Sequence, residues 1–213
     1  MIFFVPGYDS ATESNLAVAK RIVPEVCHSL LGKLATRAEL ISALNREAVP
    51  LFAMAHGRPH RLLAHGGETA LAADDSILLA RRPVFVYACH TATVLGEVAS
   101  RNGAVWWGYT GSVTAPDSAP LFLPLFAAIF SFIRDAFPHS SSPEEHSSIL
   151  LRLAELCQDA EQSIADLLDQ DPDLDVAPAY LCLSHIWQRL RVWSPGGSSP
   201  LMHPAAAAPI LLP

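Results

Sequence analysis

Charged residues are scarce in this sequence of 213 residues: Asp, Glu, Lys and Arg make up 16% of it, whereas apolar residues make up 51%. Folded domains usually hold about 25% charged residues, so this chain has the composition of a protein with a large buried core and not of a disordered one. Basic residues are the scarcer kind, with 14 Lys and Arg against 21 Asp and Glu and a net charge of −7. A nucleic-acid surface needs clustered cations to displace counterions from phosphates, so we predict no nucleic-acid partner.

Cysteines and long apolar runs are also few. The four cysteines are scattered without a C-x-x-C pair, which argues against a zinc ribbon and against a disulfide scaffold. The apolar residues 1–6 lack the basic flank and the length of a signal peptide, so we predict a cytoplasmic protein. The most apolar stretch, residues 121–133, is too short to cross a bilayer and predicts a buried helix, with no membrane insertion.

Strand-like and helix-like patterns alternate along the first half of the chain. Short apolar runs that read as strands occupy residues 2–5, 49–55, 84–88 and 104–109. Helical patterns follow Asp9 and Thr36 and run through residues 94–98. The alternation predicts an α/β fold in which a mostly parallel sheet carries helices on both faces, with further helices at the C-terminal end.

The chain divides into three parts by composition. We predict a core at residues 1–137, which contains a small hairpin at residues 58–80 and ends in a long buried helix from residue 118. Residues 143–193 predict a helical C-terminal extension, packed on the core, with helices at 143–169 and 177–193. Residues 194–213 are rich in Pro, Gly, Ser and Ala and predict a flexible tail, whose apolar end at 210–212 is able to dock.

Three of the predicted strands end in polar residues, at His56-Gly57, Cys89-His90-Thr91 and Tyr109-Thr110-Gly111-Ser112. The carboxyl ends of parallel strands converge on one edge of a sheet, so an imidazole and a thiol are expected together there. This is the arrangement that a cysteine nucleophile needs, because imidazole accepts and returns the proton. A helix that begins near Thr91 favours the thiolate of Cys89, and the backbone amides of Gly57 and Cys89 are able to face a developing oxyanion. We expect a glycine at position 57 to admit the substrate backbone.

Simpler interpretations stay open for both residues, because His56 is also consistent with a hydrogen-bonded core histidine and Cys89 with a small buried apolar residue. Other chemistries find less support. A zinc site would draw on His56, His60, His65 and Cys89, but Gly57 and Pro59 prevent the first two from sharing a helical face. The sequence has no G-x-S-x-G motif and no glycine-rich phosphate loop after its first strand. The cysteines at positions 27, 157 and 182 lie in apolar surroundings and are predicted to be packing residues.

The order of these motifs resembles that of the caspase-like cysteine peptidases. An apolar strand ends in His56-Gly57, a hairpin follows, and a second strand ends in Cys89-His90-Thr91-Ala92. Gly96 and Asn102-Gly103-Ala104 come after it. The resemblance is strongest to the CHAT and short caspase-like branch of bacteria and covers about residues 1–135. It implies an endopeptidase that uses a His/Cys dyad, needs no metal or cofactor and cleaves a protein substrate. It also implies an association with bacterial antiviral defence or cell death and a regulatory protein partner.

Carried over to this sequence, the resemblance makes His56 the general base and acid, Cys89 the nucleophile, and the amides of Gly57 and Cys89 the oxyanion site. His65, which also precedes a glycine, is an alternative base. The resemblance places substrate-binding residues after the last predicted strand, and the residues there are Tyr109, Thr110 and Asp117. Asp117 is equally suited to cap a helix, and Asp74 and Asp75 are the next acidic residues to consider for a pocket. A catalytically silent caspase-like interaction module remains the alternative function.

Overall fold

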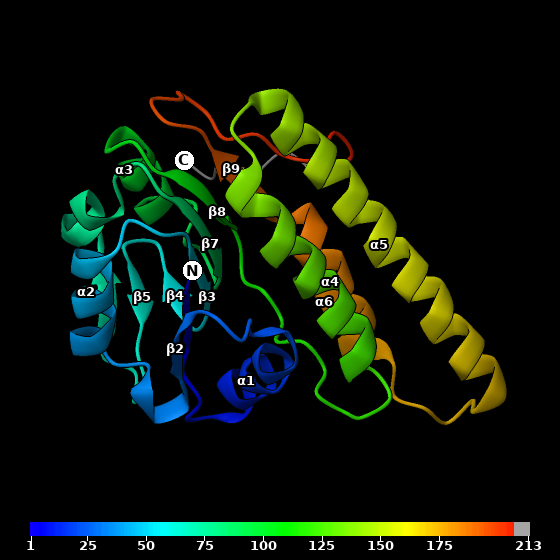
Figure 1. The fold of residues 1–213 in the computed structure, drawn as a ribbon. Helices are drawn as coiled ribbons and strands as arrows, with labels where there is room; N and C mark the ends of the chain where they lie inside the picture. Colours follow the sequence, from blue (N-terminus) through cyan, green and yellow to red (C-terminus); the bar gives the residue numbers. More distant parts are fainter. Residues whose placement is uncertain (207–213) are drawn as a thin grey trace.

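A computed structural model describes residues 1–206 and contains one large sheet, one small sheet and six α-helices among these residues (Figure 1). In chain order the elements are β1 (Ile2–Val5), α1 (Ser10–Ile22), β2 (His28–Leu31), α2 (Arg37–Arg46), β3 (Leu51–Met54), β4 (Gly57–Arg58), β5 (Arg61–Leu63), β6 (Thr69–Ala72), β7 (Pro83–Tyr87), α3 (Leu95–Arg101), β8 (Val105–Tyr109), α4 (Leu123–Ala136), α5 (Pro143–Gln170), α6 (Ala177–Gln188) and β9 (Leu190–Trp193). Short 3-10 helices occupy Gly32–Leu34, Ala73–Leu79 and Phe137–His139.

The large sheet has the strand order β2-β1-β3-β7-β8-β9. The first five strands are parallel, and only β9 runs antiparallel to its neighbour β8. Strands β4, β5 and β6 form a separate antiparallel sheet between β3 and β7 in the chain, where the sequence predicts a hairpin. The predicted α/β fold with a mostly parallel sheet and C-terminal helices is confirmed.

Helices cover the sheet on both faces because its strands are apolar on both sides. One face packs against α1, α4, α5 and α6, which lie on the right of Figure 1. It contains the buried side chains of Phe3, Val5, Phe52, Met54, Phe85, Tyr87, Trp107 and Tyr109. The other face packs against α2, α3 and the small sheet, on the left of Figure 1, through Ile2, Phe4, Leu51, Ala53, Val84, Val86 and Trp106. Alternate residues of each strand thus belong to opposite cores.

The strand order fixes where loops can diverge to form a site. After β1 the chain moves outward to β2 at the edge of the sheet and then returns to place β3 on the other side of β1. In open parallel sheets such a reversal opens a crevice outside the carboxyl ends of the two central strands. Here the crevice lies between the loops that follow β1 and β3, next to the loop that follows β7.

The C-terminal part joins the large sheet more closely than the sequence indicates. The predicted helix at 177–193 ends at Gln188, and Leu190–Trp193 form β9, which closes the free edge of β8. The four residues suit a strand because Val192 and Trp193 belong to opposite cores. Residues 194–206, the described part of the predicted tail, contact the fold, since Leu201 pairs with Val192 and His203 packs on Trp187. The predicted docking segment at 210–212 lies outside the described residues.

The apolar stretch at 121–133 belongs to the buried helix α4, which begins two residues later than that stretch. Its residues Phe126, Ile129, Phe130 and Ile133 are buried in the core. Within residues 1–206, no helix combines the length and the apolar character that crossing a membrane requires. The strand β2 is not predicted from the sequence, because only one of its four residues, Leu30, is buried. It adds to the sheet through parallel backbone pairing with β1.

Candidate active site

A small cavity of about 30 Å³ lies at the carboxyl ends of the central strands. The two residues predicted to be catalytic both contribute to its lining. His56 and Cys89 are in its lining together with Ala11, Asn15, Ala55, Tyr87, Val113 and Ala115. Backbone pairing continues beyond β3, because the N–H of Ala55 donates to the carbonyl of Tyr87 at 3.1 Å. This hydrogen bond holds Ala55, the residue before His56, beside Tyr87, which is two residues before Cys89.

The imidazole of His56 is oriented by Asp9, which lies in the loop after β1. The Nε2–H of His56 donates to Asp9 Oδ2 at 2.8 Å, since a carboxylate only accepts. Asp9 is also the N-cap of α1: its Oδ1 accepts the backbone N–H of Thr12 at 2.9 Å and the hydroxyl of Thr12 at 2.8 Å. The cap fixes the carboxylate, and the carboxylate fixes the ring, so Nδ1 is left as the nitrogen that can exchange a proton with a thiol.

Hydrogen bonding keeps the Asp9 carboxylate ionised. Partial burial would raise the pKa of Asp9, but the hydrogen bonds from Thr12 and the contact with His56 outweigh it and hold the pKa below its ordinary value. Both partners are partly open to solvent, with 41% of the Asp9 side chain and 38% of the His56 side chain exposed. Solvent therefore reaches this pair beside the cavity that His56 lines.

Cys89 is held at a turn instead of at a helix N-terminus. The predicted helix near Thr91 begins only at Leu95, so its dipole does not reach the thiol, and this part of the prediction is wrong. The residue after the cysteine, His90, has a φ of 61°, a left-handed conformation that is uncommon outside glycine. Its N–H donates to the carbonyl of Gly111 at 3.0 Å, which ties the turn to the loop after β8. Such strained turns often position functional groups.

Backbone groups of the loop after β8 contact the sulfur of Cys89. The N–H of Val113 donates to Sγ at 3.3 Å, and Sγ lies 3.7 Å from the carbonyl oxygen of Val113. The backbone N–H of Cys89 itself finds no acceptor among residues 1–206. An N–H group without a partner beside a thiol is suited to bind an oxyanion.

The protein's own backbone requires a glycine at position 57. A Cβ atom at this position would lie 2.6 Å from the carbonyl oxygen of Cys89 and 2.7 Å from the methyl group of Thr91. These distances are too short for any side chain, so only glycine lets the start of β4 pack against the Cys89 turn. The effect is to bring the two predicted oxyanion residues into contact.

Helix α6 fixes the loop that covers the cysteine. Nδ1 of His185 accepts the backbone N–H of Thr114 at 3.2 Å and lies 3.1 Å from its hydroxyl. Arg189 donates to the carbonyl of Ser112, and the hydroxyl of Tyr87 donates to the carbonyl of Thr114 at 2.6 Å. Burial, followed by the charge of Arg189, lowers the pKa of His185, which keeps its ring neutral and able to accept. Helix α6 and its C-cap residue therefore help to hold the loop that contacts Cys89.

Three residues predicted to bind substrate do not line the cavity. The Tyr109 side chain is fully buried against Phe85 and Tyr87. Thr110 is bound through its N–H to the carbonyl of Arg189 at 3.2 Å, at the edge of β8. Asp117 Oδ1 accepts the N–H of Ala119 at 2.8 Å, so its carboxylate caps the turn before α4. From the loop after β8, Val113 and Ala115 line the cavity.

The acidic pair in the Ala73–Leu79 helix also lies elsewhere, because Asp75 forms a two-pronged ion pair with Arg37 of α2, at 2.7 and 2.8 Å. His65 is not in the cavity lining: its ring packs edge-on against Tyr8 at 5.7 Å, and its Nδ1 is buried without a hydrogen-bond partner. The structure thus places His56, and not His65, beside Cys89. Among the other cysteines, Cys157 and Cys182 are fully buried in the core.

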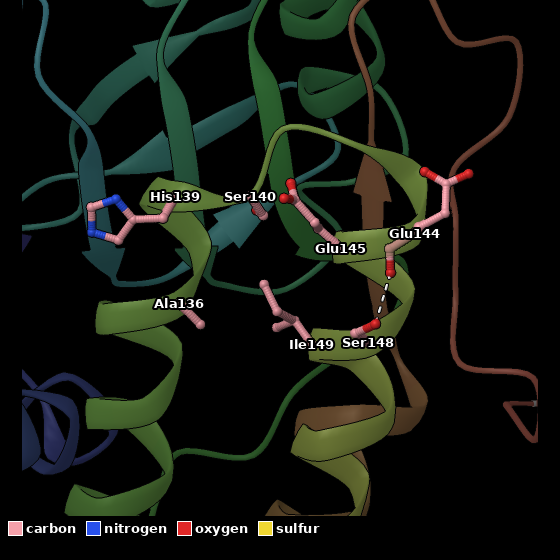
Figure 2. A pocket seen from close by; sticks show the side chains of 7 residues that line it. All are labelled: Ala136, His139, Ser140, Glu144, Glu145, Ser148 and Ile149. Atoms are coloured by element: carbon pink, nitrogen blue, oxygen red, sulfur yellow. Dashed lines mark hydrogen bonds between the residues drawn. The ribbon is translucent and has the colours of Figure 1, made fainter.

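A larger hollow of about 410 Å³ lies between the end of α4 and the start of α5, and Figure 2 shows its lining. The carboxylate of Glu145 there caps its own helix by accepting the N–H groups of Ser141 and Ser142. Ser148 donates to the carbonyl of Glu144 one turn earlier (Figure 2). The Glu145 carboxylate and the Ser148 hydroxyl are thus used in local hydrogen bonds of the helix. Within residues 1–206, no three His, Cys, Asp or Glu residues are grouped to hold a metal ion.

Two residues at the cavity, Asp9 and Asn15, are not predicted from the sequence as site residues. Asp9 is recognisable as a helix cap. Its place soon after a buried strand, behind Pro6-Gly7, is the signal that it also lies at the edge of the sheet where the cavity forms. Asn15 has no such signal, because it lies on a helical pattern among apolar neighbours. Comparison of the chain with protein-family models, with curated proteins and with solved structures finds no match.

Proposed function

We propose that this protein is a cysteine endopeptidase in which Cys89 is the nucleophile and His56 its acid and base. The observation that supports this most strongly is the shared cavity, lined by thiol and imidazole, with the imidazole oriented by Asp9. A packing cysteine and a core histidine have no need of a common cavity. They also have no need of an ionised carboxylate that fixes the ring.

Cleavage would follow the acyl-transfer course of cysteine nucleophiles. Nδ1 of His56 takes the thiol proton, and Cys89 Sγ attacks the carbonyl carbon of the scissile peptide bond. The negative oxygen that forms faces the N–H of Cys89, with Gly57 beside it. The imidazolium then gives its proton to the leaving amine, the C–N bond breaks, and a thioester remains. Water, deprotonated by His56, hydrolyses the thioester and restores the thiol.

Asp9 acts in this scheme as a positioning residue. Its contact with Nε2 leaves Nδ1 as the ring nitrogen free to exchange a proton with the thiol in this scheme, and its charge would stabilise the imidazolium between the two proton transfers. The resemblance described from the sequence implies a dyad without an essential third residue. The contact between Asp9 and His56 therefore adds a third member to the group that the resemblance implies.

The test is cleavage of a peptide library of mixed sequence by the full chain, read by mass spectrometry. We expect cleavage by the wild type and by Cys27→Ala, a matched cysteine variant away from the cavity, and none by Cys89→Ala. His56→Ala should lose about 10²- to 10⁴-fold in rate, whereas His65→Ala should keep its activity. Circular dichroism verifies that each variant is folded.

Two results would contradict the proposal. Cleavage that persists in Cys89→Ala assigns the activity to a contaminant or to another residue. A folded wild type that cleaves nothing in the library favours the alternative of a silent interaction module.

A further inference from the structure

We propose that the cavity beside Cys89 is the subsite for the residue that precedes the cleaved bond, P1, and that it selects a small uncharged side chain, serine best of all. The inference rests on the proposed peptidase function and adds the substrate class. It is carried by the size of the cavity, by the chemistry of its lining and by one buried amide.

Size is the first argument. The cavity measures about 30 Å³, which is room for one or two water-sized groups. Three alanine residues from different elements contribute to its lining: Ala11 from α1, Ala55 after β3 and Ala115 after β8. A methyl or hydroxymethyl group fits this space, whereas a leucine or arginine side chain does not.

Charge is the second argument. The ionisable residues in the lining are His56 and the weakly acidic Cys89 and Tyr87, and the lining contains no Asp, Glu, Lys or Arg. The hydroxyl of Tyr87 is fully buried and already donates to the carbonyl of Thr114. Asp9 uses its carboxylate on Thr12 and His56, and Asp117 caps a turn. An acidic or basic P1 side chain would therefore be buried without an opposite charge, which is costly.

Asn15 supplies the third argument. Its side chain lies on α1 and in the lining of the cavity, yet the residue is only 4% exposed. Its Oδ1 has no hydrogen-bond partner among the described residues. Buried polar atoms are nearly always paired in folded proteins, so an unpaired one that lines a cavity next to a thiol points to a ligand with a donor. The hydroxyl of a P1 serine is a donor of the required size.

The experiment uses the full chain and a series of peptides that are identical except at P1, where they carry Ser, Ala, Gly, Leu, Arg or Asp. Initial rates are measured by liquid chromatography and mass spectrometry. We expect the Ser, Ala and Gly peptides to be cleaved at least about tenfold faster than the other three, with Ser fastest. Fastest cleavage after Leu, Arg or Asp would overturn the inference.

Two lining variants change the size of the cavity in opposite directions. Asn15→Ala enlarges it and removes the amide, so the preference for Ser over Ala should disappear and cleavage after Leu should rise. Ala11→Val fills it, so cleavage after Ser and Ala should fall relative to cleavage after Gly. Asn45→Ala changes an exposed asparagine on α2 and should leave the whole pattern unaltered. A gain of cleavage after Leu cannot come from misfolding, and its absence in a folded Asn15→Ala protein counts against the inference.

The series separates this inference from the function on which it rests. Cleavage that depends on Cys89 but follows a large or charged residue removes the subsite assignment and leaves the peptidase intact. Absence of any cleavage that depends on Cys89, in this series and in the mixed library, removes both.

Discussion

The carboxylate of Asp9 and the imidazole of His56 meet at 2.8 Å although 46 residues separate them in the sequence. Asp9 follows β1 and His56 follows β3, and these two strands are neighbours in the sheet. From β1 the chain first adds β2 on one side and then adds β3 on the other side. The contact is thus a direct product of the strand order. It also couples a helix cap to the candidate catalytic group, because the same carboxylate binds Thr12.

Asp9→Asn separates these two tasks of the carboxylate. Asparagine caps helices about as well as aspartate, and its Oδ1 can keep the N–H of Thr12, so the melting temperature should change little. Its NH₂ group would face the Nε2–H of His56, donor against donor, and would favour the wrong tautomer. We expect kcat for peptide cleavage to fall by about 10²-fold or more with KM nearly unchanged. Wild-type kcat in Asp9→Asn would show that the contact has no part in catalysis.

Cys89 should be the first of the four cysteines to react with limiting iodoacetamide, because it is partly exposed at a cavity. Burial raises the pKa of Cys182 to about 12 and that of Cys157 well above its ordinary value, so both stay protonated thiols near neutral pH. Burial also raises the pKa of Cys27. Mass spectrometry of the native protein gives the order of labelling, and labelling in denaturant confirms that all four sites are detectable. Earlier modification of Cys27 would count against the assignment.

Gly57→Ala should damage the site through packing alone. The new methyl group would lie 2.6 Å from the Cys89 carbonyl oxygen, so β4 or the cysteine turn must move. We expect a loss of about 1–3 kcal/mol in the free energy of unfolding, together with a large loss of cleavage. Gly66→Asn is the control, because that position is open and left-handed, a conformation that asparagine tolerates. Urea unfolding and peptide cleavage are the measurements, and an undamaged Gly57→Ala protein would contradict the packing argument.

His185 should make the loop over Cys89 sensitive to acid. Burial lowers the pKa of His185 in the folded protein below the ordinary value of 6.5, so the unfolded chain binds the proton first as the pH falls. The free energy of unfolding therefore decreases from about pH 6.5 down to the lowered folded pKa. Protonation also removes the acceptor for Thr114.

The matched variant for this prediction is His185→Asn, which retains an acceptor and does not titrate. Thermal unfolding between pH 7 and pH 5 should show a weaker pH dependence for the variant than for the wild type. Some dependence remains because burial also lowers the pKa of His146, which is still present. Identical pH profiles for the two proteins would contradict the role of His185.

Asp117→Asn should be nearly neutral. Its carboxylate accepts the N–H of Ala119, and an asparagine oxygen can do the same. We expect a change below about 0.5 kcal/mol in stability and unchanged rates on every peptide of the P1 series. A loss that is confined to one class of P1 residue would restore Asp117 as a residue that reads the substrate.

The sequence by itself determined the parallel sheet and the positions of His56 and Cys89 at strand ends, because apolar runs and the polar residues that end them are local features. The length of α5 was likewise predictable, from its cap at Ser142 and its regular apolar spacing. Strand β9 was not predictable in this way, because the sequence of Leu190–Trp193 also fits the end of the preceding helix. These residues form a strand because β8 offers them a free edge.

Only the tertiary structure decided which residues surround the thiol. Asp9 reads as a cap and Asn15 as one more helical residue until the strand order brings α1 against the ends of β3 and β7. Tyr109 ends β8 and Asp117 lies in the loop after it, but the Tyr109 side chain is buried in the core and the Asp117 carboxylate caps its own turn. The physical reason is that the sequence pattern fixes the face and the end of a strand on which a residue lies. The distance between residues on different elements depends on how those elements pack.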